Sequence, residues 1–269
     1  MDTLADEQVE ADILITERQG HANELAREAV DRGAGVVVAW GGDGTVNEVA
    51  SALVGTAASL AVVPAGSGNG LARMLAMPAD GVRALTRIVH GADRLIDVGL
   101  IEDALFVNVA GVGFDAAIAA AFAAMGRGRR GFLKYAAIVG RELRRYESGT
   151  YEVVLEPAEA PTRLRAFLLS FANGRQWGNG AVIAPDAELD DGALEAVLVE
   201  DRGRPAVLAA FPRLFTGRIG SVPGVTIHRV RSATVRGTAP LMYHADGEPH
   251  LAGSTVQVRI RPAALRLRA

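Results

Sequence analysis

The chain has 269 residues, of which 49% are hydrophobic and 22% charged, and its formal net charge is −3. This composition is typical of a globular protein with one large or two ordinary domains, and the slight negative charge gives no electrostatic reason to expect nucleic-acid binding. The absence of cysteine excludes disulfides and thiolate chemistry and argues against a structural zinc site. The N-terminal segment has no secretory apolar core, and the longest apolar run, 116–125, is far shorter than the ~20 residues of a membrane-spanning helix, so we expect a cytoplasmic protein.

The first hundred residues alternate strand and helix patterns. Short apolar runs predict strands, and apolar residues at helical spacing predict helices. The predicted strands are 13–16, 36–39 and 60–63, and the predicted helices are 21–30, 46–53, 71–75 and 82–89. This alternation favours a parallel sheet with helices on its faces.

Two of these strands end in glycine-rich turns that lead into helices. The first turn is Gly41-Gly42-Asp43-Gly44-Thr45, and the second is Ala65-Gly66-Ser67-Gly68-Asn69. Glycine lets backbone N–H groups approach a ligand closely, and a helix N-terminus adds partial positive charge, so both turns suit phosphate. In a parallel sheet they lie at the carboxyl ends of neighbouring strands, where open α/β folds bind their ligands.

The first turn has other interpretations. The carboxylate of Asp43 repels phosphate unless a cation lies between them, and magnesium held by nucleotide phosphates would be such a cation. However, Asp-Gly is also a common turn that often binds nothing. A dinucleotide site needs G-x-G-x-x-G, from which Asn47 departs, and no P-loop pattern occurs in the chain. Arg73, after the second turn, either faces phosphate or covers its helix.

Strand patterns dominate from residue 95 onward. Strands are predicted at 94–100, 104–109, 151–155, 164–172, 194–199, 226–230, 233–235 and 256–260, and helices at 115–125, 132–146 and 206–215. Many strands with few crossovers favour an antiparallel sandwich. We therefore predict two domains, 1–97 and 98–269, with the active site in the cleft between them.

A third polar motif, Asp246-Gly247-Glu248, lies in the second domain. Its two carboxylates are alternate residues, which share one face in a strand, and one of them can serve as a general base for a hydroxyl nucleophile. The alternative is a solvated hairpin turn. His244 and His250 beside this turn are interpreted as surface residues rather than metal ligands.

Taken together, the segments 41–48, 64–69 and 246–248 resemble the diacylglycerol kinase catalytic-domain family, which includes bacterial lipid kinases and the sphingosine and ceramide kinases. Further matches are 108–116, Asn173-Gly174 with Gly178, and 183–194, so the resemblance covers nearly the whole chain. NAD kinases and phosphofructokinases share the Gly-Asp-Gly turn, but the later motifs are specific to the lipid-kinase branch.

The resemblance implies phosphoryl transfer from ATP to a lipid hydroxyl of a diacylglycerol-like or sphingoid lipid, with Mg²⁺ as the second cofactor. It implies an α/β nucleotide-binding domain and a β-sandwich lipid domain whose C-terminal segment returns to the first. The implied nucleotide-binding residues are Thr16, Gly41, Gly42, Asp43, Gly44, Thr45, Asn47, Glu48, Gly66, Ser67, Gly68 and Asn69.

The resemblance also implies catalytic and metal-binding roles. Asp246 is the implied base or hydroxyl-orienting group, with Glu248 close by, and Asp43 acts through magnesium or polarises the substrate hydroxyl. Asp191, with the backbone carbonyls of Glu188 and Ala193, matches a structural magnesium site of the bacterial branch that is distant from the chemistry. Asp115 either faces the lipid head group or caps a helix.

The sequence departs from the family pattern in two places. The usual N-terminal strand and Asn-Pro loop are absent, which predicts an exposed sheet edge, and Gly70 stands where many bacterial members carry aspartate. Two alternatives therefore stay open beside an active lipid kinase. One is a catalytically weak nucleotide- or lipid-binding member, and the other is a soluble NAD kinase-like enzyme.

The expected partners are a lipid substrate and the surface of a membrane, at its inner face. The basic segment 126–131 together with Arg141, Arg144 and Arg145 either meets anionic lipid head groups or is a solvated helix face. A homodimer is also considered.

Overall fold

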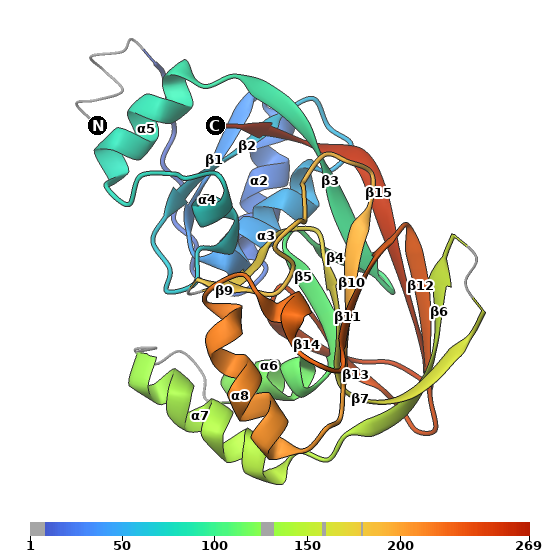
Figure 1. Ribbon diagram of the computed structural model, residues 1–269. Helices are drawn as coiled ribbons and strands as arrows, with labels where there is room; N and C mark the ends of the chain where they lie inside the picture. The colour runs from blue at the N-terminus through green and yellow to red at the C-terminus, as the bar shows by residue number, and fades with distance from the viewer. Residues whose placement is uncertain (1–8, 125–131, 158–159, 179) are drawn as a thin grey trace.

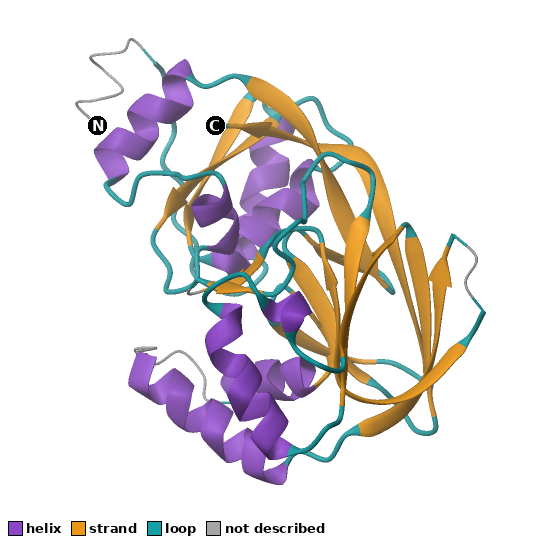
Figure 2. Ribbon diagram, in the orientation of Figure 1, coloured by secondary structure: helices purple, strands orange, loops and turns teal. Residues whose placement is uncertain are grey.

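The computed structural model describes residues 9–124, 132–157, 160–178 and 180–269. The chain forms an α/β lobe and an antiparallel β-sandwich lobe, and strands of both lobes belong to one sheet (Figure 1, Figure 2). The fold class expected from the sequence is therefore confirmed. None of the helices within the described ranges is long and apolar enough to cross a membrane.

The α/β lobe is built on two parallel strands flanked by helices. Its elements are α2 (His21–Asp31), β1 (Val36–Gly41), α3 (Asp43–Leu53), β2 (Ser59–Pro64), α4 (Gly70–Met74) and α5 (Gly81–His90). Helix α3 packs on the sheet because Val46, Val49, Ala50 and Leu53 are spaced to share one helix face, and all four are buried. Strand β1 lies at the end of the sheet, and Trp40 in it is 58% exposed.

The predicted strand at 13–16 was wrong. These residues have no regular secondary structure and are exposed to solvent. A strand is stable only when a neighbour pairs with its backbone groups, and the described pairing of β1 is with β2. The apolar run Ile13-Leu14-Ile15 therefore lacks the partner that its pattern requires.

The sandwich lobe consists of antiparallel strands around a second core. Its strands are β3 (Asp93–Ile101), β4 (Ala104–Phe106), β5 (Val109–Gly113), β6 (Gly149–Glu156), β7 (Thr162–Ala172), β10 (Leu194–Glu200), β11 (Val225–Val230), β12 (Ser232–Gly237), β13 (Met242–Ala245), β14 (Glu248–Leu251) and β15 (Thr255–Arg268), with β8 (Gln176–Gly178) and β9 (Ala181–Val182) in a separate hairpin. In β6, the alternate residues Tyr151, Val153 and Leu155 point into this core, as the two-residue period of a strand requires.

Strand β15 joins the two lobes. It pairs antiparallel with β12 and β3, and its end, at Arg266 and Leu267, pairs in parallel with β2 (Figure 1). The sequence pattern indicated only the first part of this strand, 256–260. The second part contains a register shift between Arg261 and Leu265, which breaks the alternation on which a strand prediction depends.

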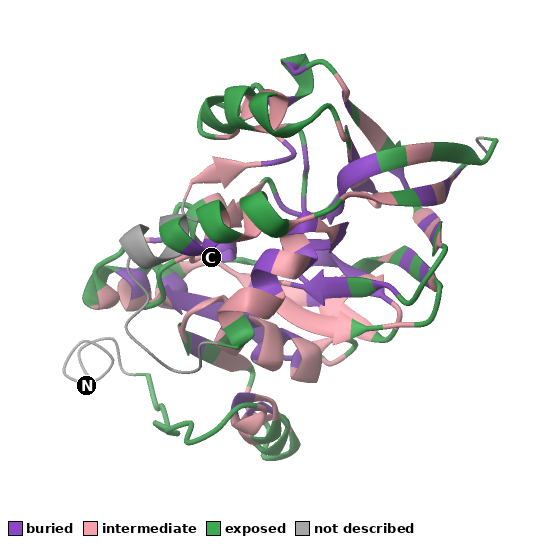
Figure 3. Cartoon of the chain, turned by 90° about the horizontal axis from the view of Figure 1, so that it is seen from below, coloured by how far each residue is buried: buried purple, intermediate pink, exposed green. Residues whose placement is uncertain are grey.

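Three helices lie together at the end of the molecule opposite α5: α6 (Phe114–Ala123), α7 (Phe132–Arg145) and α8 (Arg204–Leu214) (Figure 1). The ring of Phe114 packs against Phe167 of β7 at 4.5 Å and against Tyr146 at 5.4 Å between centroids. This aromatic cluster holds the start of α6 against the sandwich. Figure 3 shows the buried residues concentrated in the strands and the exposed ones on the outer helices.

A buried aspartate links segments at the junction of the two lobes through hydrogen bonds. Asp97, in the middle of β3, is 2% exposed, and its two carboxylate oxygens accept hydrogen bonds from the N–H groups of Gly192 (2.6 Å) and Ala263 (2.7 Å). The side chain of Asn173 donates to the carbonyls of Asp97 and Val107. Strand β3 is thereby tied to β15, to the loop before β10 and to the segment between β4 and β5.

Candidate nucleotide and catalytic site

The two glycine-rich turns touch each other at the carboxyl ends of β1 and β2. A Cβ on Gly66 would lie 2.5 Å from the Cα of Gly42, so no side chain fits at this contact. Asn69 adopts a left-handed conformation (φ 53°), and its amide accepts from the N–H of Gly66 at 2.9 Å and donates to the carbonyl of Gly66 at 2.8 Å. The second turn is therefore fixed against the first by backbone contact.

Asp43 connects the same two turns. Its Oδ2 accepts from the N–H of Asn69 at 2.9 Å, and its Oδ1 accepts from the N–H of Gly70 at 2.6 Å. A carboxylate is favourable there because the N–H groups at the start of α4 are otherwise without helical partners. Asp43 thus has a structural role that the sequence reasoning missed. Each of its oxygens accepts one of these two bonds and can accept a further hydrogen bond or a cation.

Asp246 occupies the two-residue turn between β13 and β14. Asp246 (φ 47°) and Gly247 (φ 87°) are both left-handed, as a tight hairpin turn requires. Its Oδ1 accepts from the N–H groups of Asn108 (2.9 Å) and Val109 (3.0 Å), and its Oδ2 accepts from the N–H of Val107 at 2.7 Å. These bonds explain why the predicted strand 104–109 is interrupted at 107–108, where the N–H groups turn toward Asp246 rather than toward a neighbouring strand.

The fourth partner of Asp246 comes from the other lobe. The side-chain amide of Asn47, in the first turns of α3, donates to Asp246 Oδ2 at 2.8 Å and to the carbonyl of Leu105 at 2.9 Å. A carboxylate has about four lone-pair sites, so these four donors fill it. Burial raises the pKa of the Asp246 carboxyl above its ordinary value, while the hydrogen bonds from Val107, Asn47, Val109 and Asn108 act in the opposite direction.

Two further carboxylates meet the segment that precedes α2. Glu48 accepts from the N–H groups of Gly20 (2.8 Å) and Ala22 (3.0 Å) and so holds the start of α2. Both oxygens of Glu248 lie 2.9 Å from the side-chain nitrogen of Gln19. One short segment therefore contacts carboxylates of both lobes.

The other residues predicted to bind the nucleotide have fewer described contacts. Ser67 is exposed in the second turn, and in the first turn of α3 Gly44 is exposed and Thr45 is half-buried. Thr16 lies in the exposed segment at 9–17, where no hydrogen bond joins its side chain to the turns among the described contacts. The guanidinium Nε of Arg73 donates to the carbonyl of Gly68 at 2.9 Å, so Arg73 supports the second turn.

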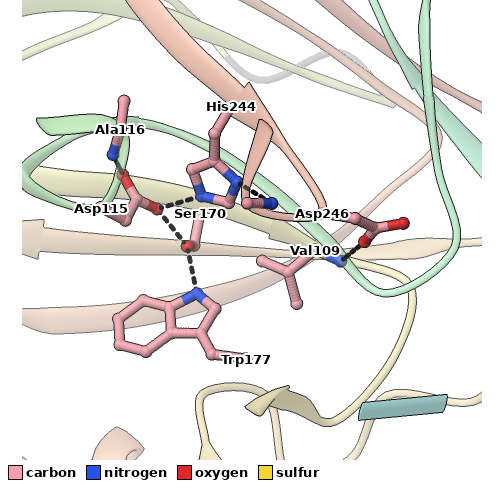
Figure 4. Close-up of polar contacts among 8 residues, drawn as sticks. Val109, Asp115, Ala116, Ser170, Trp177, His244 and Asp246 are labelled. Atoms are coloured by element: carbon pink, nitrogen blue, oxygen red, sulfur yellow. Dashed lines mark hydrogen bonds and ion pairs between the residues drawn. The ribbon is translucent and has the colours of Figure 1, made fainter. Parts of the chain in front are cut away.

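A polar network next to Asp246 was not anticipated from the sequence (Figure 4). His244 is buried; its Nδ1 accepts from the N–H of Gly247 at 3.2 Å, and its Nε2 lies 3.3 Å from Oδ2 of Asp115. The same Asp115 oxygen accepts from Ser170 at 2.9 Å, and Ser170 in turn accepts from Trp177 at 3.3 Å.

This network corrects two interpretations. His244 is not a surface residue, and Asp115 is not the N-cap residue of α6: the N-cap position is Gly113, and Asp115 lies in the first turn, where its Oδ1 accepts from the N–H of Ala116 at 2.9 Å. Since the Nδ1 of His244 accepts a backbone hydrogen bond, its proton is on Nε2, facing Asp115. By strand alternation, the apolar neighbours Tyr243 and Ala245 predict that His244 is on the solvent-facing side. His244 is buried because helix α6 packs on that side of β13.

The comparisons with known proteins agree with these motifs. Residues 1–101 match the diacylglycerol kinase catalytic domain, and residues 108–269 match the YegS C-terminal NAD kinase beta sandwich-like domain. A diacylglycerol kinase of Mycobacterium tuberculosis is 31% identical over 252 residues, which are 91% of this chain and 80% of that protein. The chain belongs to the diacylglycerol kinase catalytic-domain family.

Other members and solved structures extend this result. A probable lipid kinase YegS-like of Klebsiella pneumoniae is 30% identical, over 98% of this chain and 88% of that protein. A putative diacylglycerol kinase from Bacillus anthracis superposes with a TM-score of 0.79 at 18% identity, over 99% of this chain and 89% of that one. An NAD kinase from Archaeoglobus fulgidus in complex with ATP gives 0.55 at 12% identity, over 100% and 87%, which shows a shared fold. The expected enzyme class, a kinase with an alcohol group as acceptor, is confirmed by the family.

The structural magnesium site implied by the family is not a good fit to this chain. The carboxylate of Asp191 lies 3.0 Å from the Nη2 of Arg229, which also donates to the Asp191 carbonyl at 3.1 Å, and its other oxygen accepts from the N–H of Ala193. A guanidinium thus stands where a cation would bind. Within the described residues, no three or more His, Cys, Asp or Glu side chains gather as metal ligands. Metal binding by Asp191 with the carbonyls of Glu188 and Ala193 stays a prediction.

The basic segment 126–131 lies outside the described residues. Of the arginines expected to accompany it, Arg141, Arg144 and Arg145 are all exposed on α7. Arg141 pairs with Glu142 at 3.0 Å, whereas Arg144 and Arg145 are in the last turn of the helix.

Proposed function

We propose that this family member is an ATP-dependent lipid kinase that phosphorylates a hydroxyl of a diacylglycerol-like or sphingoid lipid. One observation carries the proposal: Asn47, two residues after the first glycine turn, is hydrogen-bonded at 2.8 Å to Asp246, 199 residues later in the chain. This bond supports a proposed phosphate-binding element and a proposed base that lie side by side across the two lobes. Phosphoryl transfer needs this kind of positioning more than covalent chemistry.

The glycine turns supply the nucleotide side of the proposed reaction. The N-terminus of α3, capped at Gly42 without a side-chain hydrogen bond, has backbone N–H groups that can stabilise the negative charge of phosphates. Magnesium carried with ATP would neutralise charge on the phosphates, and Asp43, which still has free lone pairs, fits the role of its protein ligand. Since the Cβ contact excludes side chains at Gly66, the two turns form one rigid surface.

The proton of the lipid hydroxyl must be accepted by a carboxylate near the turn. Asp246 is the proposed base, and its raised pKa favours proton acceptance. Its four lone-pair sites are filled, so the hydroxyl must replace one donor. Asn47 is the donor best suited to leave, because it is a side chain while Val107, Asn108 and Val109 donate from the backbone.

A catalytically weak binding protein is the second candidate. The filled carboxylate of Asp246 favours it, because this arrangement serves equally well as a clamp between the lobes. Glu248 also stays a candidate base, since its described hydrogen bonds come from a single donor, Gln19.

The test is transfer of labelled γ-phosphate from ATP to diacylglycerol, sphingosine or NAD offered separately. We expect label in one of the two lipids, with Mg²⁺ required. ATP binding by calorimetry without transfer to any lipid would support the second candidate, and labelling of NAD alone would show an NAD kinase-like enzyme. Asp246→Asn should lower kcat by about 100-fold to 10,000-fold, the range of general-base catalysis. Glu248→Gln is the matched variant, and thermal melting checks that both are folded.

A further inference from the structure

Helix α8 carries an apolar stripe that nothing in the described chain covers. Leu208, Phe211 and Phe215 are 61%, 46% and 46% exposed, and their spacing places them on one side of the helix. The rings of Phe211 and Phe215 pack together at 5.3 Å between centroids. Next to this stripe on the helix, Ala210 and Leu214 pack against the core. Only part of the apolar surface of the helix is therefore used in folding.

The segment that carries this stripe has charged residues of one sign. Residues 202–218 contain four arginines, Arg202, Arg204, Arg213 and Arg218, and no aspartate or glutamate. The guanidinium of Arg204 donates to the carbonyls of Leu143 and Arg144 at the end of α7, and that of Arg213 donates within α8. Arg202 is 3.4 Å from Glu200 at the edge of the segment. Because Arg204 binds these carbonyls, the C-terminal end of α7 lies beside the start of α8 (Figure 1).

We propose that the exposed face of α8, Leu208-Phe211-Phe215 with its surrounding arginines, docks the protein on a bilayer that contains anionic lipid. This inference rests on the proposed lipid substrate and names the surface through which the protein meets it. Apolar side chains with basic neighbours are the combination that holds a helix in the interface of a membrane, and each arginine near the surface adds attraction to anionic head groups. A protein partner would have to supply carboxylates for these cations, whereas anionic head groups are themselves the counterions.

The position of α8 suits delivery of a lipid to the candidate site. Val207 of α8 packs in one apolar cluster with Phe114 and Phe167. Phe114 is followed directly by Asp115, which is joined through His244 to the turn that holds Asp246. A bilayer against α8 would thus lie on the same end of the sandwich lobe as the network that supports the proposed base.

Flotation of the whole chain with lipid vesicles tests the proposal, in the absence of ATP. The vesicles are phosphatidylcholine alone, or an equal mixture of phosphatidylcholine and phosphatidylglycerol. We expect binding to the mixed vesicles that weakens with salt, and a loss of about tenfold or more in the triple variant Leu208→Ser/Phe211→Ser/Phe215→Ser. The double variant Arg213→Gln/Arg218→Gln should lose mainly the dependence on phosphatidylglycerol. Val82→Ser is the matched control, because Val82 is 56% exposed on α5, in the other lobe.

The outcomes separate this proposal from the function itself. Equal binding of the wild type and the triple variant would overturn it, as would a wild-type dimer in sedimentation that the triple variant converts to a monomer, since a second copy would then cover the stripe. The single substitution Phe211→Trp places a fluorescent side chain in the stripe. With mixed vesicles its fluorescence emission should shift to shorter wavelength, and an unchanged emission would contradict docking. Vesicle binding without any kinase turnover would leave the docking surface established and the proposed reaction refuted.

Discussion

At the scale of single residues, the proposed chemistry depends on one carboxylate with unusually many partners. Asp246 accepts four hydrogen bonds, three from the segment 107–109 and one from Asn47. Its identity as a candidate came from the Asp-Gly-Glu motif, but its partners could not be predicted, because they lie far away in the sequence. The same holds for Asp43, whose bonds to Asn69 and Gly70 depend on the packing of two turns.

The raised pKa of Asp246 predicts the pH dependence of phosphoryl transfer. A general base acts in its ionised form, and burial holds the proton of Asp246 to a higher pH than in an exposed aspartate, which titrates near pH 4. We therefore expect the acidic limb of the kcat/KM profile to lie clearly above about pH 4. Steady-state kinetics across pH, with Glu248→Gln as the comparison, measure this limb. If the acidic limb shifts in Glu248→Gln relative to the wild type, Glu248 rather than Asp246 is the group that titrates there.

His244 is predicted to position the turn that carries Asp246. Its Nδ1 accepts from Gly247 and its Nε2 faces Asp115. Asparagine keeps an acceptor near the place of Nδ1, whereas glutamine reaches toward Asp115. We expect His244→Ala to lower kcat about tenfold with little change in KM for ATP, and His244→Asn, but not His244→Gln, to restore most of it.

The control for this series is His250→Asn, because His250 stacks on Tyr243 at 5.1 Å and has no described contact with the turn. Equal losses in all three His244 variants would show that His244 acts only through packing.

At the scale of elements, the two glycine turns are in direct backbone contact, and together they form one surface. The sequence predicted both turns and the helices after them, because strand, glycine and helix patterns are local. Their mutual contact was not predictable, since it depends on the parallel pairing of β1 with β2.

This contact gives a prediction for Gly66→Ala. The added Cβ would lie 2.5 Å from the Cα of Gly42, which cannot move without shifting β1. We expect this overpacking to lower the free energy of unfolding by about 1–3 kcal/mol, which thermal melting measures. We also expect a weaker affinity for ATP, which calorimetry measures. Gly35→Ala is the control, because a Cβ there meets nothing within 4 Å. Equal melting temperatures and ATP affinities for Gly66→Ala and the wild type would refute the contact.

At the scale of the whole molecule, the lobes are held together by buried polar bonds as well as by a shared sheet. Asp97 binds the N–H groups of Gly192 and Ala263, which belong to the loop before β10 and to β15. The sequence placed a domain boundary near Asp97 from the change in pattern. In the structure Asp97 lies inside β3, so the point where the pattern changes is also where the lobes are fastened.

Asp97→Ala should therefore destabilise the whole chain. It leaves two backbone N–H groups without acceptors, at about 1–3 kcal/mol each, and we expect the melting temperature to fall by roughly 4–20 °C. Differential scanning calorimetry measures this, with Asp103→Ala as the control because Asp103 is exposed. A fall no larger than that of the control would show that the junction does not depend on Asp97.

The sequence by itself determined the fold class, the glycine turns, the Asp-Gly-Glu turn and the family, because all of these are local patterns in a fixed order along the chain. Only the tertiary structure decided which groups meet: Asn47 with Asp246, Asp43 with the start of α4, His244 with Asp115, and Arg229 with Asp191. The structure also shows that residues 13–16 do not form the predicted strand, because a strand needs a neighbouring strand to pair with. The physical reason is the same in each case, because hydrogen bonds and ion pairs depend on distance in space, and residues that bond here are as many as 229 positions apart in the chain.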